Sequence, residues 1–285
     1  PVTYKYITIC GEVAHPATFK APLGITYGEL IDLAGGATVE DPVLIAGGPM
    51  TGNITQRSDV VTKTSNAILV MPKHQYIVEK RMTPLTISMK RAMSVCCNCR
   101  MCTDLCSRHL LGHPIEPQRF MQVATSGVVN DTKPYLNTMF CSACGLCEMY
   151  SCGQGLNPRS MIVATKGMLR KNGIKIPGDV EMKEVSPTRK FRLVPVDRLT
   201  ARLGLTKYDL PAPLDEKLVE TGKVKIKLSQ SIGAPAVACV KAGDTVKAGD
   251  TVGTPTENAL SLPVHASIDG VVTEVTDKFV VIEAK

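Results

Sequence analysis

Residues 96–106 read Cys-Cys-Asn-Cys-Arg-Met-Cys-Thr-Asp-Leu-Cys, and residues 141–152 read Cys-Ser-Ala-Cys-Gly-Leu-Cys-Glu-Met-Tyr-Ser-Cys. With Cys97 left out, the first stretch has the spacing C-x2-C-x2-C-x3-C, and the second has the spacing C-x2-C-x2-C-x4-C. These two stretches contain nine of the 11 cysteines of the 285-residue chain, and only Cys10 and Cys239 lie elsewhere. The chemistry of these thiols therefore decides what the middle of the chain folds around.

Three kinds of thiol chemistry compete for this pattern. A disulfide framework is typical of short secreted chains, whereas this chain is long, opens without a signal peptide and clusters its cysteines. Structural zinc usually uses two separated C-x2-C pairs, or Cys and His pairs, to build a tetrahedron. A [4Fe–4S] cluster instead takes three thiolates from one short loop and a fourth from a distance, which is the spacing of bacterial ferredoxins. The two runs therefore favour two [4Fe–4S] clusters.

Chain geometry predicts a crossed set of ligands. Three cysteines at i, i+3 and i+6 wrap a loop around one cluster, and the fourth cysteine of the run, which follows the loop, points to the other cluster. The predicted ligands of cluster 1 are Cys96, Cys99, Cys102 and Cys152, and those of cluster 2 are Cys141, Cys144, Cys147 and Cys106. The ferredoxin run usually ends in Cys-Pro, whereas Ser107 and Gly153 follow the fourth cysteines here. Cys97 is expected to be a free thiol beside the site, with ligand exchange against Cys96 as the alternative.

The positive charge of the chain lies in the same segment as these cysteines. The formal net charge is +7, from 33 Lys and Arg against 26 Asp and Glu. Residues 82–175 contain 11 basic and four acidic residues, whereas residues 1–81 contain seven of each. Eight ligating thiolates and two oxidised cluster cores would together bring the net charge near +3. We therefore interpret the basic excess as compensation for anionic clusters, and as a docking face for an acidic redox partner, rather than as a nucleic-acid footprint.

The N-terminal part has the pattern of a small β-grasp domain. Residues 4–10 alternate like a strand, a second extended piece follows through Phe19, and Thr26 is placed to cap a short helix over 27–34. Further apolar pieces lie at 43–46, 59–61 and 67–71. The glycine-rich loop 47–52 lacks the P-loop lysine and the G-x-G-x-x-G spacing, so we expect an ordinary tight turn.

The cysteine-rich segment is expected to be helical. Helices are predicted over 83–95, over 116–125 and from Pro158 to about Lys171, the last capped by Asn157. Its apolar stripe, from Met161 to Leu169 and including Met168, is expected to be core packing rather than a ligand set. His109 and His113 are four residues apart, but Gly112 and Pro114 argue against a continuous helix, so a metal role is not favoured.

The C-terminal 60 residues predict a compact all-β module. The sequence Lys-Ala-Gly-Asp-Thr-Val occurs twice in tandem, over residues 241–252, and Gly-Asp turns separate short valine-rich strands. This pattern is typical of barrel-sandwich folds. Biotin and lipoyl carriers display a modified lysine on a hairpin tip of such a module. The corresponding stretch 257–261 has no lysine, so we expect a docking or supporting role.

The predicted architecture is therefore an α+β multidomain chain. The expected parts are an SLBB-type (soluble-ligand-binding) β-grasp domain over 1–81, an α-helical, bacterial-ferredoxin-like two-[4Fe–4S] domain over 82–177, a connecting segment with one short helix near 197–203 over 178–223, and an all-β barrel-sandwich hybrid over 224–285. No apolar run approaches the roughly 18–20 residues of a transmembrane span.

The order of these parts resembles the propanediol-utilisation cobalamin (corrinoid) reductase family, which is related to the C subunit of the Rnf electron-transport complex. The resemblance rests on Gly11-Glu12-Val13, the stretches at 43–50, 198–209 and 263–267, and both cysteine runs. In the Rnf C subunit the barrel-sandwich module is N-terminal, whereas here it is C-terminal, as in the cobalamin reductases. The resemblance also implies an N-terminal domain for FMN and NADH that would precede Pro1, so the chain is expected to be N-terminally truncated.

The family resemblance implies an NADH-dependent flavin and iron–sulfur oxidoreductase. Electrons would pass from NADH to FMN in that further domain, then through the two clusters to cob(III)alamin, the corrinoid substrate. The implied partners are a corrinoid adenosyltransferase, the diol dehydratase reactivation system and microcompartment shell proteins, with no nucleic acid. The implied location is the cytoplasm, within a bacterial microcompartment. The 285 residues alone are not expected to oxidise NADH.

Two other functions remain open from the sequence. One is an Rnf-like electron-transport subunit that passes electrons to another redox protein instead of a corrinoid. The other, from a different class, is a binding or scaffold protein in which the clusters are purely structural. Reversible reduction of the clusters would favour electron transfer, whereas redox-inert clusters with salt-sensitive DNA binding would favour the structural role.

Overall fold

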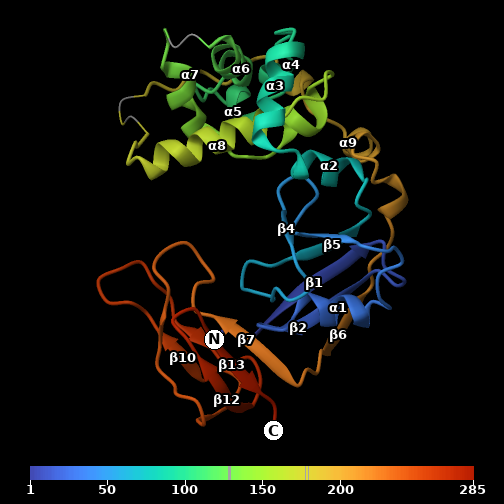
Figure 1. Ribbon diagram of the computed structural model, residues 1–285, viewed down its shortest axis with the longest axis vertical. Coiled ribbons are helices and arrows are strands. Elements are labelled where there is room, and N and C mark those ends of the chain that lie inside the picture. Colours follow the sequence, from blue (N-terminus) through green and yellow to red (C-terminus); the bar gives the residue numbers. More distant parts are fainter. Residues whose placement is uncertain (128–129, 177, 179) are drawn as a thin grey trace. The chain divides into compact units, whose positions relative to one another are not determined.

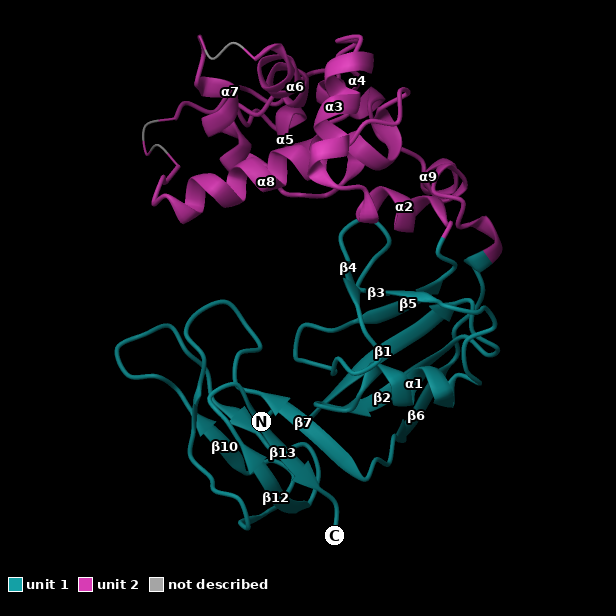
Figure 2. Ribbon diagram, in the orientation of Figure 1, with its two compact units in different colours: residues 1–73, 208–285 teal, residues 74–207 magenta. Residues whose placement is uncertain are grey.

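The computed structural model describes residues 1–127, 130–176, 178 and 180–285. The chain forms two compact units, one made of residues 1–73 with 208–285 and the other of residues 74–207 (Figure 2). The first unit is discontinuous in sequence, because the chain leaves it after the N-terminal sheet and returns to it for the C-terminal strands. Residues 74–207 have a net charge of +11 and the remaining residues a net charge of −4. The positive charge that the sequence places around the cysteines therefore lies in the second unit, and the first unit has a small negative net charge.

The N-terminal sheet of the first unit has the β-grasp pattern, in the strand order β4-β3-β5-β1-β2-β6 (Figure 1). Strands β1 and β2 form an antiparallel hairpin, and β5 pairs with β1 in parallel. The short helix α1 begins after a capping box, in which the Thr26 hydroxyl accepts from Glu29 N and the Glu29 carboxylate accepts from Thr26 N. The elements are β1 Tyr4–Gly11, β2 Ala17–Pro22, α1 Tyr27–Leu33, β3 Val43–Ala46, β4 Asn53–Thr55, β5 Ala67–Met71 and β6 Leu214–Leu218.

Two details of this sheet differ from the sequence expectation. Residues 59–61 form no named strand: Val60 and Val61 are buried, and Val60 makes only an isolated bridge with Thr26. Strand β6 comes from the stretch predicted as a connecting segment and pairs in parallel with β2. The loop 47–52 is the tight turn that was predicted, closed by a hydrogen bond from Gly52 N to Gly48 O (2.7 Å) between β3 and β4.

The C-terminal module is all-β, with two small sheets in the orders β11-β10-β8 and β7-β13-β12-β9. The tandem repeat forms the same turn twice: the carboxylates of Asp244 and Asp250 each accept from the amide three residues earlier at 2.8 Å. Gly243 and Gly249, both with φ near +98°, complete the two turns. The strands are β7 Lys223–Lys227, β8 Val237–Ala238, β9 Thr245–Val246, β10 Thr251–Thr254, β11 Val264–His265, β12 Gly270–Val275 and β13 Phe279–Glu283.

The two modules of the first unit share one hydrophobic core. That core runs without a break from Ile7 and Leu30 of the β-grasp sheet to Val252 and Ile282 of the barrel sandwich. Glu29 accepts from Thr221 Oγ1 (2.7 Å), Ser267 Oγ donates to Leu23 O (2.5 Å), and Lys225 N donates to Gly24 O (2.9 Å). The β-grasp and barrel-sandwich modules are therefore one packed body.

The second unit is helical, and part of its core packs against the cysteines. One cluster of buried residues in it consists of Ala92, Phe120, Met121, Leu156, Met161 and Ile162, and Cys96, Cys141 and Cys152 pack against them. The predicted helices over 83–95 and 116–125 are confirmed as α3 and α6, and the one near 197–203 as α9. The elements are α2 Tyr76–Met82, α3 Leu85–Val95, α4 Met101–Asp104, α5 Ser107–Leu110, α6 Pro117–Ser126, α7 Lys133–Leu136, the 3-10 turn η1 Asn137–Phe140, the π-helical turn η2 Cys147–Ser151, α8 Pro158–Lys171, the 3-10 turns η3 Arg189–Phe191 and η4 Thr206–Tyr208, and α9 Val196–Arg202.

Helix α8 begins where it was predicted, but the cap is different. Asn157 occupies the N-cap position without a capping hydrogen bond from its side chain. The buried carboxylate of Glu148 takes that role, because it accepts from Ser160 N (2.8 Å) and from Ser160 Oγ (3.1 Å). The predicted apolar stripe holds for Met161 and Ile162, whereas Met168 is 58% exposed. Asn157 is thus free for a different contact, described below.

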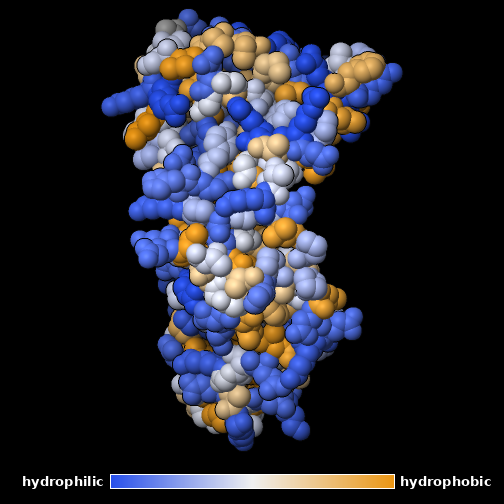
Figure 3. Space-filling model, turned by 90° about the vertical axis from the view of Figure 1, so that its right-hand side faces the viewer, coloured by the Kyte–Doolittle hydropathy of each residue, from blue (hydrophilic) through white to orange (hydrophobic). Residues whose placement is uncertain are grey.

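On the face shown in Figure 3, hydrophobic side chains lie among hydrophilic ones. Within the described parts of the chain, no helix is both long and apolar enough to cross a membrane.

Candidate metal centres

The two cysteine loops have the same backbone conformation. In each loop the residue just before the middle cysteine and the residue just after it adopt the left-handed region. These residues are Asn98 (φ +54°) and Arg100 (φ +68°) in the first loop, and Ala143 (φ +58°) and Gly145 (φ +84°) in the second. Three of the four are not glycine, and each such conformation costs about 1–3 kcal/mol. Strain repeated at equivalent positions indicates that both loops are shaped for the same purpose.

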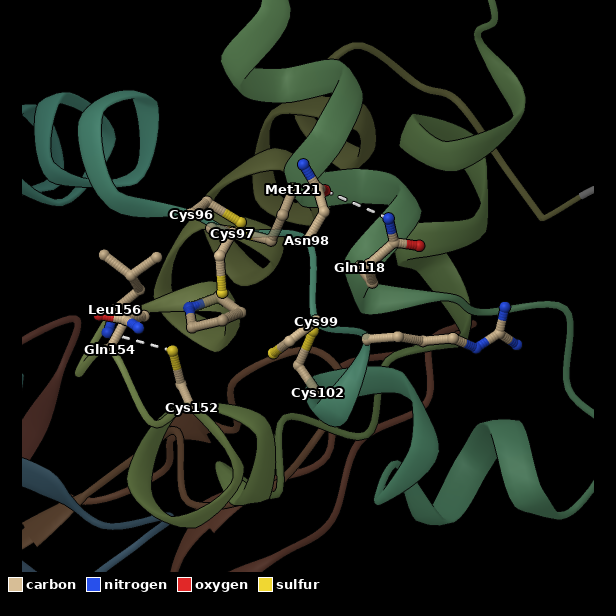
Figure 4. Close-up of a pocket in the computed structure, with 12 residues that line it drawn as sticks. Cys96, Cys97, Asn98, Cys99, Cys102, Gln118, Met121, Cys152, Gln154 and Leu156 are labelled. Carbon is tan, nitrogen blue, oxygen red and sulfur yellow. Dashed lines mark hydrogen bonds between the residues drawn. The ribbon is translucent and has the colours of Figure 1, made fainter.

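The first loop, together with Cys152, lines one cavity (Figure 4). Cys96 and Cys99 face it from the segment that joins α3 to α4, Cys102 faces it from α4, and Cys152 faces it from the position just after η2. Cys97 lines the same cavity and is exposed. The Gln118 side chain on α6 donates to Asn98 Oδ1 (3.2 Å), which links the strained loop to a helix. The structure therefore brings together all four cysteines predicted for cluster 1.

The second loop, together with Cys106, lines a separate cavity. Cys141 and Cys144 come from the stretch between η1 and η2, Cys147 is the first residue of η2, and Cys106 is the N-cap residue of α5. Cys147 is almost completely buried, and the other three thiols are partly buried. The four cysteines predicted for cluster 2 thus also share one cavity. The crossed exchange of the fourth cysteine is visible in both directions, although ligation itself stays a prediction.

Backbone amides donate to sulfur atoms at both sites. Ala143 N lies 3.3 Å from Cys141 Sγ, and Leu156 N lies 3.3 Å from Cys152 Sγ. Such N–H···S contacts stabilise negative charge on a thiolate and are one of the means by which proteins set cluster potentials. The amides are positioned by the left-handed turn at Ala143 and by the loop that leads into α8.

Burial raises the pKa values of four of the thiols that line the two cavities. Desolvation is the largest cause for Cys102, whose pKa is raised to about 12, and the nearby Cys152, Cys99 and Cys96 raise it further. Desolvation also raises the pKa of Cys106, with a smaller contribution from Cys144 and Cys141. Burial raises the pKa values of Cys141 and Cys147 as well. These thiols are therefore protonated at neutral pH unless a cationic metal centre stabilises their thiolate forms.

Basic side chains surround the second cavity. Arg108 and Arg159 line it, Lys166 Nζ donates to Cys141 O (2.6 Å), and Arg159 Nε lies 3.4 Å from Ala143 O. At the first cavity, Arg100 is paired with Asp104 (3.1 Å) and Glu116 (3.5 Å). The cationic groups beside the cysteines agree with the charge compensation predicted from the sequence.

The donor sets fit a polynuclear cluster better than a single metal ion. Each set consists of four thiols arranged around a cavity. Within the described residues, no three His, Cys, Asp or Glu side chains converge closely enough to hold one metal ion. A tetrahedral zinc site needs its sulfurs about 2.3 Å from a single point. The arrangement therefore favours iron–sulfur clusters over zinc.

The two histidines near Cys106 have other roles. His109 Nδ1 lies 3.0 Å from Ile115 O, and His113 Nε2 lies 3.0 Å from Arg108 Nη1. Both side chains therefore hold the loop between α5 and α6. Neither lies among the residues that line the two cysteine cavities.

Sequence reasoning missed the buried polar residues that support the two loops. Glu148, beside Cys147, is 1% exposed and caps α8, and Lys80 on α2 is 8% exposed and contacts the loop after Cys152. No motif marks either residue. The only local feature that could have drawn attention to Glu148 is its position directly after Cys147.

Comparison with known families agrees with this fold and these sites. Residues 6–53 match the SLBB domain, residues 95–157 match the 4Fe-4S dicluster domain, and residues 214–285 match the RnfC barrel sandwich hybrid domain. Fold and sites together define an α+β multidomain iron–sulfur protein of the dicluster class.

Individual relatives narrow the class further. The chain is 39% identical over 283 residues to cobalamin reductase PduS of Salmonella typhimurium and 38% identical to that of Citrobacter freundii, covering 99% of this chain. It is 30% identical over 112 residues, 39% of its length, to the C subunit of the Na⁺-translocating ferredoxin:NAD⁺ oxidoreductase complex of Acetobacterium woodii, and these residues span 23% of that protein. The chain is therefore related to the cobalamin reductases, as the sequence predicted, and shares domains with the Rnf-type C subunits. It spans 62% of the length of the two cobalamin reductases.

Proposed function

We propose that this chain binds two [4Fe–4S] clusters and passes single electrons through them to a corrinoid. The observation that best supports the proposal is the division of eight thiols into two groups of four, each around its own cavity. The proposed ligands are Cys96, Cys99, Cys102 and Cys152 for cluster 1, and Cys141, Cys144, Cys147 and Cys106 for cluster 2. Similarity to proteins named cobalamin reductase supports cob(III)alamin as the final acceptor.

The residues of this chain have three tasks in the proposed role. When bound, each cluster supplies reversible one-electron chemistry. The thiols hold the iron, the amides of Ala143 and Leu156 stabilise negative charge on sulfur, and Lys166 and Arg159 offset charge at the second cavity. The packed side chains of Phe120, Met121 and Ile162 limit access of water to the centres. No acid–base or nucleophilic group is required.

The origin of the electrons and the cellular setting complete the proposal. NADH would deliver a hydride to FMN bound elsewhere in the enzyme, and the flavin would release the electron pair one at a time. Corrinoid reduced toward cob(II)alamin would serve an adenosyltransferase and a diol dehydratase reactivation system within a bacterial microcompartment. Similarity to the cobalamin reductases supports these assignments.

Iron and labile sulfide analysis of the anaerobically purified protein tests the cluster content. We expect about eight Fe and about eight sulfides per chain, with EPR signals of two reduced [4Fe–4S] clusters. The double variant Cys99→Ser/Cys144→Ser should lose most of the iron, whereas Cys239→Ser, an exposed cysteine of the other unit, should keep it. Stoichiometric zinc in place of iron would refute the proposal.

An Rnf-like role is the second candidate, because the C-terminal module matches the RnfC barrel sandwich and 112 residues match part of an ion-translocating complex. Rapid mixing of dithionite-reduced protein with hydroxocobalamin distinguishes the corrinoid role from the Rnf-like role. Reoxidation of both clusters with formation of cob(II)alamin supports the corrinoid role. Clusters that are reoxidised by ferredoxin but not by hydroxocobalamin would favour the Rnf-like role, and clusters that dithionite does not reduce would favour a structural role.

A further inference from the structure

Lys80 is a buried ammonium group beside the first cysteine cavity. Lys80 is 8% exposed and lies on the short helix α2, which precedes both cysteine runs in the sequence. The ammonium donates to Asn157 Oδ1 (2.8 Å), to Leu156 O (3.3 Å) and, in a short contact, to Gly155 O. It also lies 5.8 Å from the centroid of the Tyr76 ring, one turn earlier on α2. Every contact on the loop is therefore made within five residues of Cys152.

The same contacts hold the amide that donates to Cys152. Lys80 bonds the carbonyls of Gly155 and Leu156, and the N–H of Leu156 points at Cys152 Sγ (3.3 Å), as Figure 4 shows. Asn157 extends the network, since its amide donates to Ser88 Oγ (3.0 Å) on α3. Asn157 and Ser88 are both 2% exposed. The network thus ties α2 and α3 to the loop that delivers the fourth cysteine of the first cavity.

The hydrogen-bond partners of the ammonium within the described residues are neutral groups. Among the described residues, no carboxylate lies within 4 Å of Lys80 Nζ. Burial lowers the pKa of Lys80, and Glu148 and Cys152 are the negative groups that oppose this effect. A buried charge without a counter-ion is costly, and proteins normally pair it. Cys152 belongs to the thiol set around the first cavity, which would become anionic in the holoprotein.

We infer that Lys80 is the counter-charge of cluster 1 and positions its ligand Cys152. This inference rests on the proposed two-cluster function. A [4Fe–4S] cluster with four thiolates is anionic and gains one further negative charge on reduction, so a nearby buried cation favours the reduced form. Lys80 therefore raises the reduction potential of cluster 1 relative to the same centre without it. It acts through charge and through Cys152, as a positioning residue.

The test is an EPR-monitored redox titration of three variants of the full chain. Lys80→Met removes the charge, Lys80→Arg keeps it, and Asn157→Asp places a carboxylate against Lys80 while leaving its contacts to Gly155 and Leu156 in place. Lys90→Met, which removes an exposed lysine from α3, is the matched control. Cys152→Ser identifies which EPR signal belongs to cluster 1.

We expect Lys80→Met and Asn157→Asp each to disfavour reduction of cluster 1 at least tenfold, a fall of about 59 mV for a one-electron couple. Lys80→Arg and Lys90→Met should shift the reduction potential of cluster 1 much less. The potential of cluster 2 should stay unchanged in all four variants. If Lys80→Met loses one cluster, the potential measured for Asn157→Asp alone tests the inference. An unchanged cluster 1 potential in Asn157→Asp, or equal shifts of both clusters, would overturn the inference. A parent protein without about eight Fe would instead refute the proposed function.

Discussion

At the scale of single residues, the cysteine loops depend on four left-handed positions. Asn98, Arg100, Ala143 and Gly145 place the middle cysteine of each run between two reversals of the chain. Only glycine adopts this conformation without strain, so three of the four positions store energy that the bound centre must offset. The loops are therefore more sensitive to backbone-restricting substitutions than the helices around them.

The substitution Gly145→Val should abolish cluster 2 and spare cluster 1. A β-branched residue strongly disfavours φ of +84°, so the loop would not place Cys144 and Cys147 together. Iron content should fall from about eight to about four per chain. Gly167→Val is the control, because Gly167 lies in α8 with open space around it and should leave the iron content unchanged. Full iron content in Gly145→Val would contradict the role assigned to this turn.

Iron uptake should depend steeply on pH. The pKa of Cys102 is raised to about 12 by burial, and those of Cys106, Cys141 and Cys147 are raised as well, so these thiols bind protons that iron must displace. Affinity for iron should accordingly rise as the pH increases from 7 to 9 and fall on acidification. Reconstitution of cluster-free protein in weakly buffered solution should release protons as iron binds. A pH-independent affinity would be inconsistent with protonated thiols.

At the scale of elements, the tandem repeat produces two equivalent turns. In each turn, an aspartate side chain accepts a hydrogen bond from the backbone amide three residues earlier. The backbone of the aspartate and of the glycine before it exchanges two hydrogen bonds with a single facing residue. Gly243 N donates to Val272 O, and Val272 N donates to Asp244 O; Gly249 and Asp250 make the same pair of bonds with Ala266. An identical sequence thus gives identical local geometry at two places in the barrel sandwich.

Asp244→Ala and Asp250→Ala should destabilise the first unit by similar amounts. Each removes one side-chain hydrogen bond of a turn, so the free energy of unfolding should fall by about 1 kcal/mol. Denaturant unfolding of the two variants measures the effect. Glu257→Ala, on an exposed loop of the same module, is the control and should change stability little. Markedly unequal effects of the two aspartates would show that the turns are not energetically equivalent.

At the scale of the whole molecule, the two units differ in what stabilises them. The unit of residues 1–73 and 208–285 has one long hydrophobic core through both of its modules. In the unit of residues 74–207, a cluster of six buried residues has three cysteines packed against it. Small cores are commonly supplemented by metal sites. We expect the proposed clusters to be part of the stability of the second unit alone.

Removal of iron should therefore loosen one unit and not the other. Treatment with a chelator and an oxidant should increase hydrogen exchange of backbone amides across α3, α4, α6 and α8, by more than tenfold in the segments around the cysteine loops. Amides of β1, β5 and β13 should stay protected. Hydrogen-exchange mass spectrometry of the full chain resolves the two units. Equal loss of protection in both would show that their stabilities are coupled.

Much of the architecture was predictable from local patterns. The spacing of the cysteines predicted that they form two groups, the capping residues around Thr26 predicted α1, and the Gly-Asp repeats predicted the β-module. These predictions succeeded where the deciding interactions lie within a few residues of one another, as in a capping box or a three-residue turn. Helix α2 and strand β6 were missed, because both are defined by partners far away in sequence.

The sequence by itself indicated the kind of chemistry, since eight clustered cysteines with ferredoxin-like spacing favour iron–sulfur centres. Only the tertiary structure decided which side chains from other elements support the two cysteine loops. It brought Lys80 to the loop after Cys152, assigned the cap of α8 to Glu148 rather than Asn157, and joined residues 1–73 to 208–285. The physical reason is that burial and hydrogen-bond geometry depend on every element packed around a group, whereas motif spacing depends only on the chain next to it.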